Sequence, residues 1–70
     1  MEIKNEEDAR AMITKWQGLP VPAQKREILL AVQKLELSSM YYEQKGNNQG
    51  VIRSENCIQM LKEYLNTLED

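Results

Sequence analysis

Apolar residues in this chain recur at intervals of three and four, and they divide into three segments separated by residues typical of turns. In the first segment, residues 6–17, this spacing places the large apolar side chains on one side of a helix. Asn5 is a favourable N-cap before the segment, and Gly18 occupies the position of a C-terminal glycine after it. The apolar stripe consists of Ala9, Met12, Ile13 and Trp16. The pattern therefore predicts a helix over residues 6–17.

The second segment, residues 22–45, is apolar on two opposite sides when its residues are spaced by about 100° around a helix. Pro22 suits the first turn of such a helix, and Gly46 follows its last residue. One side carries Ile28, Ala31, Val32, Leu35 and Tyr42. The other side carries Leu30, Leu37 and Tyr41, with Leu29 and Met40 at its flank. Because a helix that is apolar on two sides usually has a neighbour on each, we expect the helix over residues 22–45 to be central.

The third segment, residues 51–68, carries an apolar seam with alternating spacings of three and four. The seam consists of Val51, Ser54, Ile58, Leu61, Leu65 and Leu68, with Cys57 and Tyr64 widening one side. The composition of residues 46–50 (Gly-Asn-Asn-Gln-Gly) indicates a turn that suits an antiparallel helical hairpin. The pattern predicts a third helix over residues 51–68, whose start lies between Asn48 and Ser54.

These segments predict an all-α fold of one small domain spanning residues 1–70. The helices over 22–45 and 51–68 form a long antiparallel hairpin, and the helix over 6–17 packs on one end of it. That first helix is about 18 Å long and the second about 36 Å, so the first cannot cover the whole second apolar side. The short connection between them places it over residues 28–30. The other end, residues 37–41, is then either core within one chain or a contact with another chain, and both interpretations stay open.

The composition narrows the function classes. Nine Lys and Arg are outnumbered by eleven Asp and Glu, whereas a nucleic-acid-binding domain normally carries a basic surplus. The longest apolar run, residues 28–32, is too short to span a bilayer. Cys57 is the only cysteine and the chain has no histidine, so neither an internal disulfide nor a zinc site is expected. A lone cysteine and an acidic N-terminus unlike a signal peptide favour a cytoplasmic protein.

Candidate catalytic groups are weak. Ser38 and Ser39 have no histidine to activate them, and Cys57 is interpreted as a small buried apolar residue. The acidic pair Glu36 and Glu43 is interpreted as solvated surface. We therefore expect no enzyme, no cofactor and no metal site.

The sequence favours a small protein-interaction module that self-associates or binds a partner protein, regulating or occluding it. The predicted interface residues are Leu30, Leu37, Met40 and Tyr41. Two alternatives remain. One is a nucleic-acid-associated regulator that uses Lys25 and Arg26 near the start of the second helix. The other is a structural subunit of a larger assembly.

Overall fold

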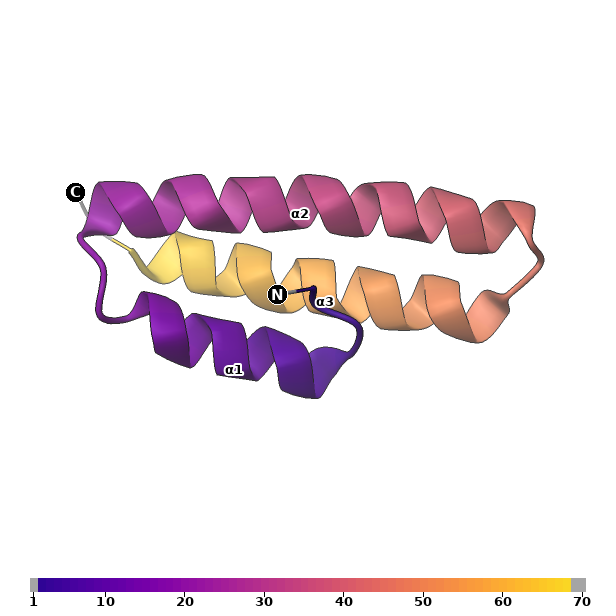
Figure 1. Cartoon of the computed structure of the whole chain (residues 1–70), viewed down its shortest axis with the longest axis horizontal. Helices are drawn as coiled ribbons and strands as arrows, with labels where there is room; N and C mark the ends of the chain where they lie inside the picture. The colour runs from indigo at the N-terminus through magenta and orange to yellow at the C-terminus, as the bar shows by residue number, and fades with distance from the viewer. Residues whose placement is uncertain (1, 69–70) are drawn as a thin grey trace.

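The computed structural model describes residues 2–68, which form three helices and contain no strand. The helices are α1 (Glu6–Trp16), α2 (Val21–Gln44) and α3 (Asn48–Thr67). They run roughly along one direction in an elongated molecule of 39 × 19 × 18 Å, and α3, rather than α2, packs against both other helices (Figure 1). The most extensive packing joins α2 and α3, which form an antiparallel hairpin. The all-α fold predicted from the sequence is thereby confirmed.

The start of α1 follows the prediction. Asn5 has an extended backbone, and its side-chain oxygen accepts a hydrogen bond of 2.9 Å from the backbone N–H of Asp8. Gly18 does not take the left-handed conformation of a C-terminal glycine cap. Within the described residues only Gly46 does, with φ of 72°, and there it ends α2. The end of α2 at Gly46 was thus predicted correctly. At the end of α1, by contrast, the C-cap residue Gln17 keeps a right-handed helical backbone.

The turn predicted over residues 46–50 is shorter than expected. Asn47 caps α3, because its side-chain oxygen accepts a hydrogen bond of 3.0 Å from the backbone N–H of Gly50. The helix therefore begins at Asn48, the earliest start that the sequence allowed. Gly50 lies in its first turn, where a Cβ atom would lie 2.5 Å from Cγ of Tyr42. The missing side chain lets the ring of Tyr42 pack directly on α3.

The buried core is shared by all three helices. It consists of Ala9, Trp16, Ile28, Val32, Leu35, Cys57 and Leu61. Cys57 is fully buried, as expected for a small apolar residue, and this desolvation is the main reason that the pKa of its thiol is raised. The nearby carboxylates of Glu6 and Asp8 raise it further. Each helix therefore buries one apolar face in this core.

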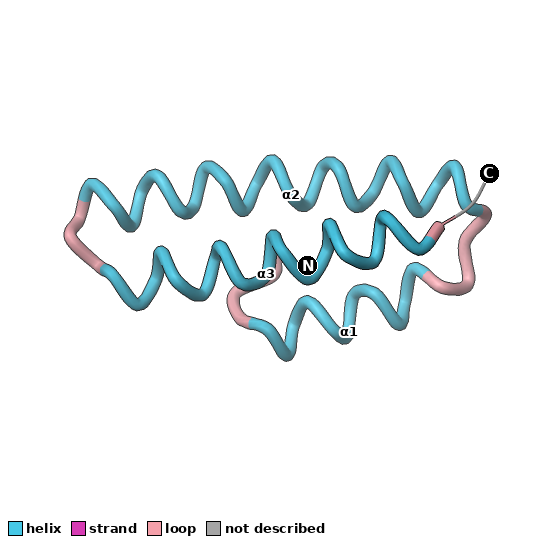
Figure 2. The backbone as a smooth tube through the Cα atoms, turned by 180° about the vertical axis from the view of Figure 1, so that it is seen from behind, coloured by secondary structure: helices cyan, strands magenta, loops and turns pink. Residues whose placement is uncertain are grey.

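The position of α1 corrects the prediction. The first helix was expected over residues 28–30 of the second, but α1 packs mainly against α3, and Leu30 remains 49% exposed. The physical reason lies in where the apolar surfaces meet. Against α3, the side chains of Ala9 and Trp16 join the shared core, whereas a helix over Leu30 would contact α2 alone. Both views show the hairpin end projecting beyond α1 (Figures 1 and 2).

A buried polar contact fixes the connection between α1 and α2. Gln24 is 5% exposed, and its Nε2 donates a hydrogen bond of 2.8 Å to the carbonyl of Leu19. Its Oε1 accepts a hydrogen bond from the hydroxyl of Tyr64 on α3. One side chain thus joins the connection, α2 and the C-terminal half of α3.

Candidate protein-interaction face

The side of α2 that points away from α3 is apolar and open to solvent. We call the four residues predicted as an interface the outer face of α2. They are Leu30, Leu37, Met40 and Tyr41, with exposed fractions of 49%, 66%, 59% and 57%. None of them is part of the buried core of the chain. Of the two interpretations left open for residues 37–41, the intramolecular core is therefore excluded.

Helical geometry explains why α2 has this second face. Ile28, Val32 and Leu35 recur at intervals of four and three, and all are buried against the rest of the molecule. Leu30 and Leu37 lie seven residues apart, close to two turns, and therefore on a common side. That side is nearly opposite the buried one. The same 24-residue helix consequently supplies both the core and an apolar surface that the chain does not cover.

The C-terminal half of the outer face is a continuous cluster. Leu37 lies three residues before Met40 and four before Tyr41, the two spacings at which helical side chains are neighbours. The ring of Tyr41 meets that of Tyr42 edge to face, with centroids 5.8 Å apart and planes at 67°. The ammonium of Lys45 lies 5.7 Å from the Tyr41 centroid, at the outer limit of a cation–π contact. Tyr41 is thus held at the surface by contacts on its own helix.

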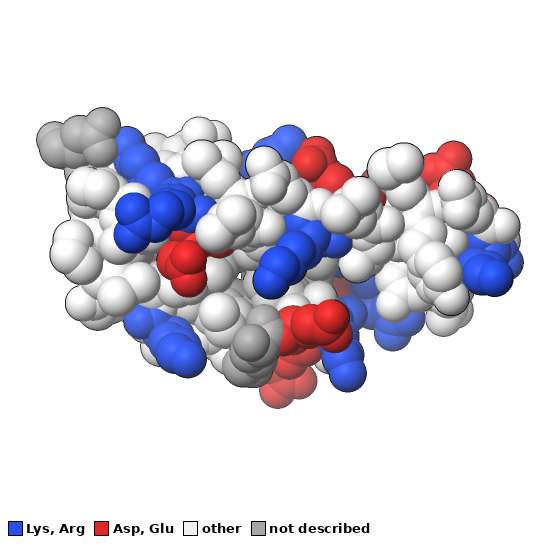
Figure 3. Space-filling model, turned by 45° about the horizontal axis from the view of Figure 1, so that its top comes forward, with Lys and Arg blue, Asp and Glu red and all other residues white. Residues whose placement is uncertain are grey.

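Charges do not segregate on the side of the molecule that α2 dominates. With α2 turned forward, basic and acidic side chains form small groups, several of which contain both signs in contact, and uncharged surface lies between the groups (Figure 3). The four residues of the outer face are uncharged, but the exposed Arg26 and Lys34 lie four residues before and after Leu30 on the same side of α2. The surface therefore provides apolar contact area with basic side chains beside it.

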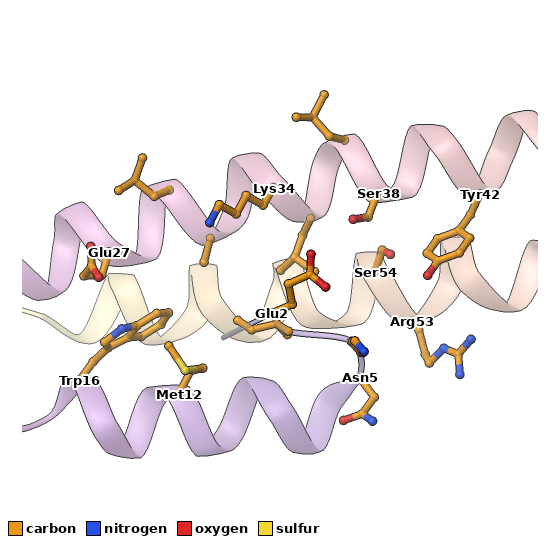
Figure 4. A pocket seen from close by; sticks show the side chains of 16 residues that line it. Glu2, Asn5, Met12, Trp16, Glu27, Lys34, Ser38, Tyr42, Arg53 and Ser54 are labelled. Atoms are coloured by element: carbon orange, nitrogen blue, oxygen red, sulfur yellow. The ribbon is translucent and has the colours of Figure 1, made fainter.

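A groove adjoins the outer face because α1 packs on α3 rather than on α2. It has a volume of about 800 Å³, and Leu30 and Leu37 line it from the α2 side. Met12 and Trp16 reach into it from α1, and the N-terminal segment crosses it (Figure 4). From that segment, Ile3 packs against the core. The sequence alone could not reveal this groove, since the groove depends on whether α1 packs against α2 or against α3.

The groove shows no arrangement suited to metal chemistry. Within residues 2–68, no three His, Cys, Asp or Glu side chains gather into a metal-binding group. Charged residues of both signs line it, namely Glu2, Lys4, Glu27, Lys34 and Arg53. Glu6, outside the groove, accepts a hydrogen bond of 3.1 Å from Nδ2 of Asn56, which is the main reason that its pKa is lowered. This exposed contact ties α1 to α3.

Comparison with known proteins adds no functional information. The sequence matches no protein-family model, and no curated protein or solved structure is significantly similar to it. No helix in the described part of the chain has the length and apolar character needed to cross a membrane. The function is therefore argued from the surface of the molecule.

Proposed function

We propose that this chain is a small, non-enzymatic protein-interaction module that binds a protein partner or a second copy of itself through the outer face of α2. In this role it regulates or occludes what it binds. The observation that carries the proposal is the exposure of four large apolar residues, between 49% and 66% each, along one helix. Exposed apolar surface that includes tyrosine and methionine is typical of protein contact surfaces.

Two further features support a binding role. The chain has no histidine to serve as a general base, and Cys57 is buried with a raised pKa, which disfavours a nucleophilic thiolate. A single unpaired cysteine also suits a reducing compartment, so we place the protein in the cytoplasm.

The test compares variants that place a charge on the outer face with one that places it elsewhere. Leu37→Glu and Tyr41→Glu alter the face, and Ile52→Glu is the control because Ile52 is similarly exposed, at 58%, on α3. Circular dichroism first establishes that all three variants are folded. Sedimentation velocity then measures self-association, and quantitative capture from an extract of the native host measures partner binding.

The proposal predicts that the association of the parent chain is lost in Leu37→Glu and Tyr41→Glu and kept in Ile52→Glu. Retention of every association by both outer-face variants would remove the face as the interface. So would a parent chain that associates with nothing in either measurement.

A further inference from the structure

We propose that the outer face of α2 binds the same face of a second copy of this chain, with the two α2 helices antiparallel about a two-fold axis between Gln33 and Lys34. This inference rests on the proposed function and names its partner. It follows from the surface area of the chain, the register of the apolar residues and the charges beside them.

The chain exposes more surface than a compact monomer of its size. Its accessible surface is 5066 Å², whereas a typical monomer of 8.2 kDa exposes roughly 4,500 Å². The excess is about 500 Å² per chain, and two copies together provide about 1,000 Å², which is the lower bound of a specific interface. An interface between two copies can thus bury the excess surface of both chains. Because its area is close to this lower bound, we expect the affinity of the dimer to be weak.

The register follows from the positions of the two leucines. In an antiparallel pair, an axis between Gln33 and Lys34 places Leu30 of one copy opposite Leu37 of the other, and the symmetry repeats this contact. The axis lies one residue from the middle of α2, so residues 23–44 of one copy lie beside the same residues of the other. This register therefore combines two leucine layers with almost complete overlap of the helices.

The charges beside the outer face favour the antiparallel direction. A parallel pair in register would set Arg26 against Arg26 and Lys34 against Lys34, which is unfavourable between like charges. In the antiparallel register, Arg26 lies opposite Tyr41 of the second copy, where a guanidinium can contact the ring face. Lys34 adjoins the axis, so its two copies are offset by only about 1.5 Å along the helices and stay close, whereas the two copies of Arg26 are separated by about 22 Å.

The surrounding helices leave room for this partner. The outer face points away from α3, and α1 packs mainly against α3 and has few contacts with α2. The hairpin end, which carries Leu37 and Tyr41, projects beyond α1 (Figure 2). A second α2 can therefore lie along the first without displacing any element of the fold.

Sedimentation equilibrium across a concentration series tests whether the dimer forms. The parent chain is expected to show a concentration-dependent monomer–dimer equilibrium. In Leu37→Glu the charge enters both leucine layers, so the dissociation constant should rise by at least about 100-fold. Ile52→Glu should match the parent. A parent chain that is monomeric at every concentration overturns the inference.

Disulfide trapping tests the direction and register. Leu30→Cys and Leu37→Cys chains of distinguishable mass are oxidised separately and as a mixture, and the parent, whose only thiol is the buried Cys57, gives the background. In the proposed register, two copies of residue 30 are offset by about 10 Å along the axis, beyond the reach of a disulfide. We expect the mixed species to dominate. Self-linking of each single variant without the mixed species would overturn the proposed arrangement.

The two proposals can fail separately. If the chain is monomeric but Leu37→Glu abolishes capture of a host protein that Ile52→Glu retains, the second copy is excluded and the interaction face stands. If neither self-association nor capture depends on Leu37, both proposals fail.

Discussion

The two sides of α2 have similar residues and opposite environments. Ile28 is fully buried and Leu35 is 4% exposed on the inner side, whereas Leu30 and Leu37, each two residues further along, are 49% and 66% exposed on the outer side. The residue types do not account for this difference. It arises because α3 covers one side of α2 and α1 packs on α3. The comparison shows that this chain uses part of its apolar surface to fold and leaves a comparable part available for contact.

The largest expected effect concerns the core that α3 shares with the inner side of α2. Leu61 is fully buried in the shared core, so Leu61→Ala should lower the free energy of unfolding by about 2–5 kcal/mol. That is comparable to the total stability of a domain of this size, so much of the protein should be unfolded. Thermal melting followed by circular dichroism measures it. Ile52→Ala, an exposed position on the same helix, should change stability by less than about 0.5 kcal/mol. A melting transition that Leu61→Ala leaves intact would contradict the packing of α3.

The next largest effect concerns how the inner side of α2 packs on α3 at the hairpin end. Gly50→Ala would place a Cβ atom 2.5 Å from the Tyr42 ring, so the ring must move away from α3. We expect a loss of about 1–3 kcal/mol in urea unfolding. Gly18→Ala is the matched control, since its Cβ would meet only the carbonyl oxygen of Lys15, at 3.8 Å. Equal stability of the two variants would show that Tyr42 does not pack against Gly50.

A smaller effect concerns the buried polar contact at the other end of α2. Tyr64→Phe removes the hydroxyl that donates to Gln24 and leaves a buried amide oxygen without that hydrogen bond. The free energy of unfolding should fall by about 1–2 kcal/mol. Tyr41→Phe, on the outer face, should cost less than about 0.5 kcal/mol. The contact carries no stability if the two tyrosine variants unfold at the same urea concentration.

The smallest effect concerns α1, which contacts neither side of α2 extensively. The hydrogen bond from Asn56 lowers the pKa of Glu6 below its ordinary value of 4.5. A carboxyl whose pKa is depressed in the folded state stabilises the protein above its unfolded pKa, and this contribution is lost as the pH falls through the folded pKa. In Glu6→Gln, the free energy of unfolding should therefore fall less steeply as the pH is lowered.

Glu7→Gln is the control for this pH dependence, because Glu7 is exposed in the same turn and differs in lacking the bond to Asn56. It makes the same change of charge near the start of α1. Acid unfolding curves that coincide for the two variants would show that the contact between Glu6 and Asn56 does not form in solution.

Much of this fold could be predicted because its signals are local. The cap at Asn5, the stop at Gly46 and the seam around Leu61 each depend on a few neighbouring residues, and the structure agrees with each. The exposure of Leu37 was left open by the sequence, and it is decided in the structure by the packing of α1 on α3, which leaves the outer face of α2 uncovered.

The remaining features depend on contacts between distant segments. The stripe of Ala9 and Trp16 could pack against either longer helix, and only the shared core around Cys57 decides between them. The exposure of Leu30 and the adjoining groove follow from that choice. Gln24 and Tyr64 are forty residues apart, so no spacing rule connects them. The cation–π contact between Tyr41 and Lys45 did have a local signal, since the two residues are four apart on one helix.

The most direct test of the division between the two sides of α2 is the unfolding free energy of Leu35→Ala and Leu37→Ala, measured in urea at a protein concentration low enough to prevent association. The two positions have the same side chain, lie two residues apart, and differ in exposure from 4% to 66%. We predict a loss of about 2–5 kcal/mol for Leu35→Ala and less than about 0.5 kcal/mol for Leu37→Ala. Equal losses would contradict the division and show that Leu37 belongs to the core of a single chain.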